Sequence, residues 1–209
     1  MARAEFPTAA AWVPSRPRLP KLIRAAKSCE GCDLYKHATQ TVFGAGPAKA
    51  RIMLVGEQPG DREDLAGKPF VGPAGQLLDK ALLEAGIDRN AVYVTNAVKH
   101  FKFEERGKRR IHAKPRAAEV AACEPWLEAE VAVIQPKLIV ALGATAAQVL
   151  LGRAFRLTQG RGQFFPHPWG PRVLATVHPS ALLRMPDKAL RDAEFAALVR
   201  DLRLLLPYR

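Results

Sequence analysis

Four short, largely apolar runs set the architecture that we expect for this chain. They are residues 51–56, 91–98, 137–143 and 173–177. Runs that are apolar at consecutive positions are typical of parallel strands buried on both faces. Between the first two runs, residues 73–85 carry leucines on one helical face, with Pro73 in the first turn and Gly86 as the stop. This pattern predicts a strand, a helix and a second strand.

The rest of the chain continues the alternation of strands and helices. Helices are expected at 21–27, from Pro115, over 144–151 and from Asp187, whereas residues 153–171 are rich in Gly and Pro and predict a hairpin or an irregular excursion. Parallel strands joined by helices need right-handed crossovers. We therefore predict an α/β fold, with three α/β/α layers around a central four-stranded parallel sheet.

Length and composition indicate one domain. A chain of 209 residues suffices for one well-buried core, which we place at 21–209. Residues 1–20 hold four prolines and predict an extended N-terminal arm. The start lacks an apolar signal core, and no apolar run approaches the roughly 20 residues that span a bilayer, so a cytoplasmic protein without a membrane partner is expected.

The charge of the chain favours a polyanionic partner. Lys and Arg number 32 against 20 Asp and Glu, a net charge of +12. Residues 99–116 hold eight basic and two acidic residues, so this stretch alone supplies six of those charges. Neutralising phosphates releases counterions, which favours nucleic acid, although a merely basic surface would have the same composition.

Three cysteines are too few for a disulfide framework and point to metal binding or burial. Cys29 and Cys32 form a Cys-x-x-Cys motif just after the first expected helix, where two thiolates can converge on one metal centre; a redox-active pair or a zinc site would have the same motif. Cys123 shares a helical face with Val120 and Leu127, so it should point inward, either as a ligand or as a plain buried cysteine.

Polar residues follow the first expected strand. Gly56-Glu57-Gln58-Pro59-Gly60 lies at its carboxyl end, where ligands bind in open α/β sheets. Asn96 lies near the carboxyl end of the second strand. Phe70 stands in a glycine-flanked loop, a position that without other evidence is typical of an aromatic packed on the core.

Four motifs, in this order, resemble those of the uracil-DNA glycosylase superfamily, and most closely its iron-sulfur, family-4-like members. They are residues 56–60, 67–75, 92–99 and His178-Pro179-Ser180-Ala181-Leu182-Leu183-Arg184. The chain departs from family 4 at His100, where that family has a cysteine, at Gln58, where it usually has Ala, and in a longer loop with Lys108-Arg109-Arg110-Ile111-His112. These departures resemble the UdgX branch, whose members excise uracil and become joined to the DNA through the histidine of this loop.

The resemblance implies roles for the pocket residues. Uracil would be flipped out of the DNA, preferably from a single strand, and would lie near Gly56 and Gln58, stacked on Phe70 and read by Asn96. His178 would donate a hydrogen bond to uracil O2 as the glycosidic bond breaks. Arg184 and the basic residues Lys108, Arg109 and Arg110 would hold the phosphates.

The resemblance also implies a covalent step and a cofactor. Neutral imidazole is a good nucleophile, and His112 would bond to the deoxyribose C1′, with Glu57 orienting its ring; the alternative is a histidine that only contacts phosphate. Cys29, Cys32, His100 and Cys123 would hold a [4Fe-4S] cluster, although zinc would accept the same ligands. The expected protein is monomeric. The alternatives are a conventional glycosylase that turns over, or a non-catalytic iron-sulfur module that binds DNA.

Overall fold

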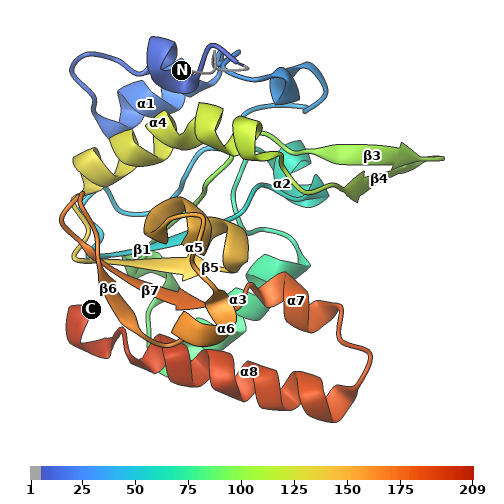
Figure 1. Ribbon diagram of the computed structural model, residues 1–209, viewed down its shortest axis with the longest axis vertical. Helices are drawn as coiled ribbons and strands as arrows, with labels where there is room; N and C mark the ends of the chain where they lie inside the picture. The colour runs from blue at the N-terminus through green and yellow to red at the C-terminus, as the bar shows by residue number, and fades with distance from the viewer. Residues whose placement is uncertain (1–5) are drawn as a thin grey trace.

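A five-stranded sheet in the order β2-β1-β5-β7-β6 forms the centre of the computed structural model, which describes residues 6–209 (Figure 1). Four of these strands are parallel, as predicted, while β6 pairs with β7 in antiparallel fashion. The fifth strand lies in the Gly- and Pro-rich stretch, for which the sequence predicted a hairpin or an irregular excursion; its antiparallel pairing with the next strand is that of a hairpin. It was not counted among the strands of the sheet because it has three residues and ends in proline, which suits only a sheet edge. The strands are β1 (Ile52–Gly56), β2 (Tyr93–Asn96), β5 (Leu138–Leu142), β6 (Phe164–Pro166) and β7 (Arg172–Thr176).

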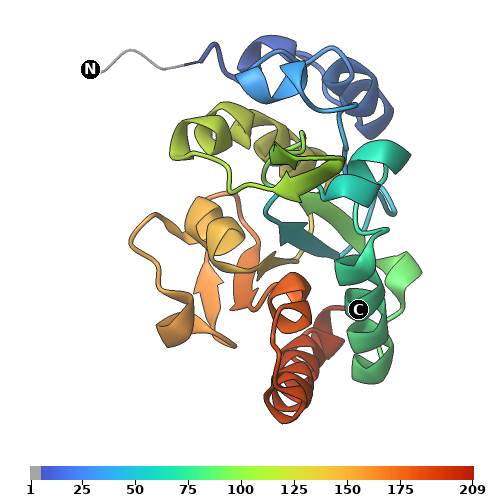
Figure 2. The same cartoon turned by 90° about the vertical axis from the view of Figure 1, so that its right-hand side faces the viewer.

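Helices cover both faces of the sheet, so the predicted three-layer α/β/α arrangement is confirmed (Figure 2). On one face, α3 (Pro73–Ala85) and α8 (Lys188–Arg203) pack on Leu54 and Val140. On the other face, α4 (Ala117–Ile134) and α5 (Ala144–Leu151) pack on the alternate strand residues, such as Val55 and Ile139. Burial on both faces explains why the strand sequences are continuously apolar.

The outer side of α4 is covered by the N-terminal segment, which comprises η1 (Ala9–Trp12), α1 (Leu19–Ala26) and η2 (Asp33–Lys36) (Figure 1). Cys123 is buried between α4 and this N-terminal segment rather than against the sheet. The predicted extended arm is helical at residues 9–12 and again from 19, because Ala9 and Leu22 bury apolar surface against α4. Residues 1–5 of the arm lie outside the described part.

The basic stretch is a β-hairpin and not simply the loop that we expected. Strands β3 (Phe103–Arg106) and β4 (Arg109–His112) pair in antiparallel fashion and project from the body (Figure 1). Gly107 adopts a φ of +60° in the two-residue turn, as such hairpins require. The strands are short, largely charged and exposed, so they lack the apolar alternation that marks a strand in sequence.

Short elements complete the chain. They are α2 (Asp61–Ala66), η3 (Arg89–Ala91), α6 (Leu157–Gly160), α7 (Pro179–Leu183) and η4 (Leu206–Tyr208). None of the helices within residues 6–209 is both long and apolar enough to cross a membrane.

Candidate active site

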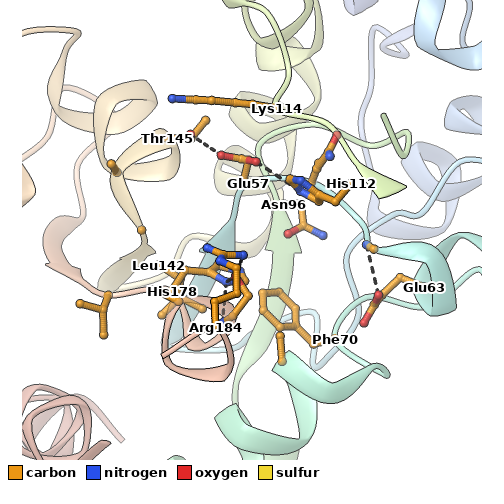
Figure 3. A pocket seen from close by; sticks show the side chains of 18 of the residues that line it. Glu57, Glu63, Phe70, Asn96, His112, Lys114, Leu142, Thr145, His178 and Arg184 are labelled. Atoms are coloured by element: carbon orange, nitrogen blue, oxygen red, sulfur yellow. Dashed lines mark hydrogen bonds and ion pairs between the residues drawn. The ribbon is translucent and has the colours of Figure 1, made fainter. Parts of the chain in front are cut away.

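A cavity of about 670 Å³ opens at the carboxyl ends of the parallel strands. It brings together most of the residues that the sequence singled out, and they come from four separate motifs (Figure 3). The predicted residues in its lining are Glu57, Gln58, Phe70, Asn96, His112, His178 and Arg184. The predicted location at this edge of the sheet is therefore correct.

The floor of the cavity depends on the absence of a side chain at Gly56. A Cβ atom built on this residue would lie 2.4 Å from Asn96 Oδ1 and 2.8 Å from Phe70 Cζ. Asn96 is 3% exposed, and its side-chain amide makes no hydrogen bond to any residue in the 6–209 range. Its donor and acceptor are therefore available to a ligand.

The loop that carries Phe70 is held by a buried carboxylate. Glu63 accepts hydrogen bonds from the backbone N–H groups of Gly60 and Gly72, at 3.1 and 2.6 Å. Phe70 itself adopts a φ of +57°, and a Cβ on Gly75 would lie 1.9 Å from its carbonyl oxygen. A side chain in this left-handed conformation needs such support from its surroundings. The Phe70 ring is thereby presented to the cavity, with its centroid 6.1 Å from that of His178.

The hydrogen bonds of His178 define its tautomer. Its Nδ1 accepts the backbone N–H of Ser180 at 3.1 Å and lies 2.8 Å from the Ser180 hydroxyl oxygen, as the N-cap of α7. Burial, with the nearby positive charge of Arg184, lowers the pKa of His178 to about 4. A neutral ring that accepts at Nδ1 carries its proton on Nε2. That atom faces Gly56, so His178 directs a hydrogen-bond donor into the cavity.

Glu57 and His112 meet across the mouth of the cavity (Figure 3). Glu57 Oε1 lies 3.4 Å from His112 Nε2, and the hydroxyl of Thr145 donates a hydrogen bond to the other carboxylate oxygen. The His112 side chain remains 48% exposed. One ring nitrogen is therefore oriented by a fixed carboxylate, while the ring stays accessible to a ligand.

Gln58 differs from its expected role, because its side chain binds the hairpin. Its Nε2 donates to the carbonyl oxygens of Lys102 and Ala113, at 3.1 and 3.0 Å, and its Oε1 accepts the Lys102 N–H at 3.0 Å. Lys102 precedes β3 and Ala113 follows β4, so one amide side chain holds both ends of the hairpin. Its hydrogen-bonding groups are thus already used within the protein.

Arg110 also differs from the expected phosphate contact. It pairs with Asp61 at 2.6 Å and with Asp64 at 2.7 Å, both on α2, and its guanidinium lies over the ring of Phe103. These contacts fasten the hairpin strand to the body. Lys108 and Arg109, by contrast, are exposed at the hairpin tip, and neither forms an ion pair with a described residue.

Other basic residues of the same stretch are also engaged internally. Lys99 is fully buried and pairs with Glu130, whereas Lys102 and Arg116 pair with Glu119. Much of the positive charge counted from the sequence is therefore balanced within the fold. Lys114 lines the cavity.

The three cysteines are buried between α4 and the N-terminal segment. Burial raises the pKa of Cys123 to about 12, against the opposing effects of Lys99 and its backbone N–H, and burial likewise raises the pKa of Cys32. Two N–H groups already point at sulfur: Trp126 Nε1 donates to Cys29 Sγ at 3.2 Å, and the Lys99 N–H donates to Cys123 Sγ at 3.3 Å.

His100, the fourth expected ligand, has a different partner. Its Nε2 lies 2.9 Å from the hydroxyl of Thr41, and burial lowers its pKa to about 4. No group of three or more His, Cys, Asp or Glu side chains within residues 6–209 is arranged around a single ion position. In a [4Fe-4S] cluster, however, each ligand binds a different iron atom, so its ligands need not converge on one point.

Comparison with protein families identifies the superfamily to which the chain belongs. Residues 43–203 match the family model described as the uracil DNA glycosylase superfamily. The chain belongs to the uracil-DNA glycosylase superfamily. The resemblance first seen in four short motifs thus extends over most of the chain, including the strands and loops that form the cavity.

Similar members of the superfamily include enzymes of two types. A type-4 uracil-DNA glycosylase of Thermotoga maritima is 42% identical over 168 residues, which are 79% of this chain and 83% of the relative. A type-4 enzyme of Pyrobaculum aerophilum is 37% identical, covering 80% of this chain and 86% of its own. A type-5 enzyme of Thermus thermophilus is 30% identical, covering 78% and 80%.

Three supporting residues of the site were missed from the sequence. Thr145 orients Glu57, Ser180 fixes the tautomer of His178, and Glu63 holds the Phe70 loop. Glu63 could have been found, because Gly60 followed three residues later by Glu is the spacing of a capping box. Thr145 could not have been found, because its partner Glu57 follows a different strand and is distant from it in the sequence.

The lowered pKa of His178 predicts a specific pH dependence of stability. The folded state holds the ring neutral down to about pH 4, while the unfolded state binds a proton below about pH 6.5. Stability should therefore fall as the pH drops from 6.5 towards 4. His178→Asn keeps an N-cap acceptor for Ser180 but removes the titrating ring. Relative to this variant, the wild type should lose on the order of 2 kcal/mol over that interval.

Urea unfolding of both proteins at several pH values between 7.5 and 4 would measure the difference. If the free energy of unfolding changes with pH by the same amount in both proteins, His178 has an ordinary pKa in the folded state, which would contradict the prediction.

Proposed function

We propose that this protein flips uracil out of DNA, cleaves its glycosidic bond, and becomes covalently attached to the deoxyribose C1′ through His112. The observation that carries the proposal is the cavity in which Phe70, Asn96 and the Nε2–H of His178 converge beneath the Glu57–His112 pair. Relatives named as type-4 uracil-DNA glycosylases support the first two steps.

Recognition of uracil follows from the floor of the cavity. The unpaired amide of Asn96 offers a donor and an acceptor side by side, which match O4 and N3–H of uracil. Cytosine has the opposite arrangement at these atoms, so it would leave buried polar groups unpaired. Phe70 supplies a flat face for the extruded ring, and the missing side chain at Gly56 gives the base room.

Cleavage is assisted by stabilising the negative charge that uracil acquires. As the bond from C1′ to N1 breaks, its electron pair leaves with the base and the charge spreads to O2 and O4. The neutral ring of His178 accepts the Ser180 N–H at Nδ1 and therefore carries its proton on Nε2, which is directed at the cavity and can donate a hydrogen bond to O2. A fixed donor in a site that excludes water is worth more than the same donor in solution.

The covalent step uses the ring of His112. A ring nitrogen attacks C1′ as positive charge develops on the sugar, the carbon–nitrogen bond to uracil breaks, and a bond between C1′ and imidazole forms in its place. Glu57 holds the other nitrogen and stabilises the positive charge that the ring gains; Thr145 in turn holds Glu57. A nucleophile positioned in this way outcompetes water because it loses little entropy on reaction.

Phosphate binding is assigned to the basic groups around the mouth. Lys114 and Arg184 line the cavity, and Lys108 and Arg109 are exposed at the tip of the hairpin, so none of the four needs to break the internal ion pairs described above. Arg110 contributes by anchoring the hairpin. Single-stranded DNA is the favoured substrate because flipping a base from a duplex costs a few kcal/mol in lost pairing and stacking.

We further propose that Cys29, Cys32, His100 and Cys123 hold a [4Fe-4S] cluster. Buried thiols and N–H donors aimed at two of the sulfurs fit such a group, which would fasten the N-terminal segment to α4 and to the end of β2. Ligation by His100 requires its ring to leave Thr41. Zinc is the alternative occupant of the same four residues.

A second candidate is a conventional glycosylase that releases DNA with an abasic site. The identity to enzymes named type-4 uracil-DNA glycosylases favours it. In that case Glu57 would orient a water molecule, and His112 would serve only in binding.

A denaturing gel tests the covalent step. The protein is mixed with labelled single-stranded DNA that contains one uracil, then heated in SDS; we expect a protein-bound DNA band. His112→Ser should lose this band and release DNA that alkali cleaves, because the pocket floor remains intact and water can reach the sugar. DNA with thymine in place of uracil is the control.

If the wild type produces alkali-cleavable DNA but no protein-bound band, the conventional enzyme is supported and covalent attachment to DNA is refuted. Intact DNA would refute both. An undiminished band with His112→Ser would remove His112 from the proposed role.

Metal analysis tests the cofactor. Protein purified without oxygen should be brown, with broad visible absorbance and about four irons per chain. Cys123→Ser should lose most of the colour and part of the thermal stability, because the joint between α4 and the N-terminal segment is weakened. One zinc ion per colourless chain would contradict the cluster.

A further inference from the structure

Behind the cavity, on the opposite face of β2, lies a network of charged and hydroxyl groups that is sealed from solvent. Its centre is the ion pair of Lys99 and Glu130, whose side chains are both 0% exposed. Lys99 Nζ lies 2.5 Å from Glu130 Oε2, 2.7 Å from Thr95 Oγ1 and 2.6 Å from the backbone oxygen of Asn96. The third of these bonds reaches the residue whose side chain lies in the cavity.

The alternation of side chains along β2 places the network directly behind Asn96. Tyr93 and Thr95 point towards α4, where both donate hydrogen bonds to Glu130, at 2.8 Å from the Tyr93 hydroxyl and 2.9 Å from the Thr95 hydroxyl. Asn96 points to the other face, into the cavity. Its backbone is held from two sides: Lys99 binds its carbonyl oxygen, and the next N–H, of Ala97, donates to the carbonyl oxygen of Gly56 at 2.9 Å.

The network leaves little freedom to any member. The ammonium has three protons and three acceptors, and the ring of Phe43 lies 5.3 Å from Nζ. Such a pair is a weak source of stability, because the loss of hydration roughly offsets the attraction between the charges. What it does supply is a fixed position for the backbone to which it is bonded.

We propose that Lys99 and Glu130 are positioning residues for Asn96, which hold its amide in the orientation that reads uracil. Neither side chain touches the cavity. They act by fixing the carbonyl of Asn96 and the hydroxyl of Thr95, so that the strand end cannot rotate and carry the amide away from the base. This inference rests on the proposed function, in which Asn96 binds the base.

The test is a neutral replacement of the pair, Lys99→Met with Glu130→Gln. The glutamine side chain keeps an acceptor for Tyr93 and Thr95, and the methionine fills the space of the lysine, so no charge is left buried alone. Excision is followed under single-turnover conditions on single-stranded DNA with one uracil, over a range of protein concentrations. A misplaced catalytic contact should lower the plateau rate by about 10- to 100-fold. The half-saturating concentration should change by less than about twofold, because the phosphate contacts are unaltered.

A matched control neutralises another ion pair, which is partly buried and does not line the cavity. Arg161→Gln with Asp201→Asn removes its contact of 2.7 Å, together with that of Arg161 to Glu194 at 2.6 Å. This variant should retain the wild-type plateau rate even if its melting temperature falls. An equal fall in both double variants, or an unchanged plateau in Lys99→Met with Glu130→Gln, would overturn the inference.

Two further variants keep the outcome decisive. If the neutral pair does not fold, Thr95→Val removes one partner of both Lys99 and Glu130 at nearly constant volume, and it should lower the plateau rate several-fold; a wild-type plateau would reject the inference. Asn96→Ala serves as the benchmark. If Asn96→Ala excises uracil at the wild-type plateau rate, the proposed reading of uracil by Asn96 is refuted. If Asn96→Ala loses excision while Lys99→Met with Glu130→Gln keeps the wild-type rate, only the positioning role is refuted.

Discussion

Three hydrogen bonds from one side chain connect the two halves of the site. Gln58 holds the backbone on both sides of the β3–β4 hairpin, while its neighbours Gly56 and Glu57 form the cavity floor and contact His112. The end of β1 thus fixes where the base would lie and where the hairpin histidine can reach. The pairing register of β3 and β4 also determines where His112 lies. Arg110 and His112 are two residues apart on β4 and share one of its faces, so a shift of the register by one residue would turn both side chains away from the body.

The same hairpin shows that its basic residues serve two different purposes. Its root and inner face use Lys102 and Arg110 in ion pairs with the body, whereas its tip exposes Lys108 and Arg109. Paired charges fix geometry, and exposed charges attract a polyanion over distances up to about 10 Å at moderate salt. A count of basic residues cannot separate these uses, because it ignores which acidic side chains are near in space.

Much of the fold could be predicted because it follows from local patterns. The four parallel strands and the helices at 73–85 and from Asp187 were evident from continuous apolar runs and from helical spacing with start and stop signals. Strand β6 was expected only as a hairpin or an irregular excursion and not as part of the sheet, and the β3–β4 hairpin was expected as a loop, since both are short and their pairing depends on neighbours rather than on hydrophobic alternation. Gly56, Asn96 and His178 were found because they lie at or just after strand ends within recognisable motifs.

The contacts that support the site could not be predicted from the sequence. Gln58 was assigned to substrate and Arg110 to phosphate, but each binds residues at least 44 positions away in the chain. Such partners are set by tertiary packing, as is the position of Thr145 beside Glu57. The buried position of Cys123 was predicted, and Cys29 and Cys32 lie in the same buried cluster; that α4 is covered by the N-terminal segment as well as packed on the sheet was not predicted.

The hairpin anchor can be tested directly with Gln58→Leu, which removes all three hydrogen bonds at similar volume. Glu57, Asn96 and His178 are untouched, so uracil excision should continue at a rate within about tenfold of the wild type. Attachment of the protein to DNA should fall much further, because His112 loses its fixed position while water still reaches the sugar. The ratio of bound to alkali-cleavable DNA, measured on one denaturing gel, gives both quantities. An unchanged ratio would contradict the view that Gln58 positions the hairpin for reaction.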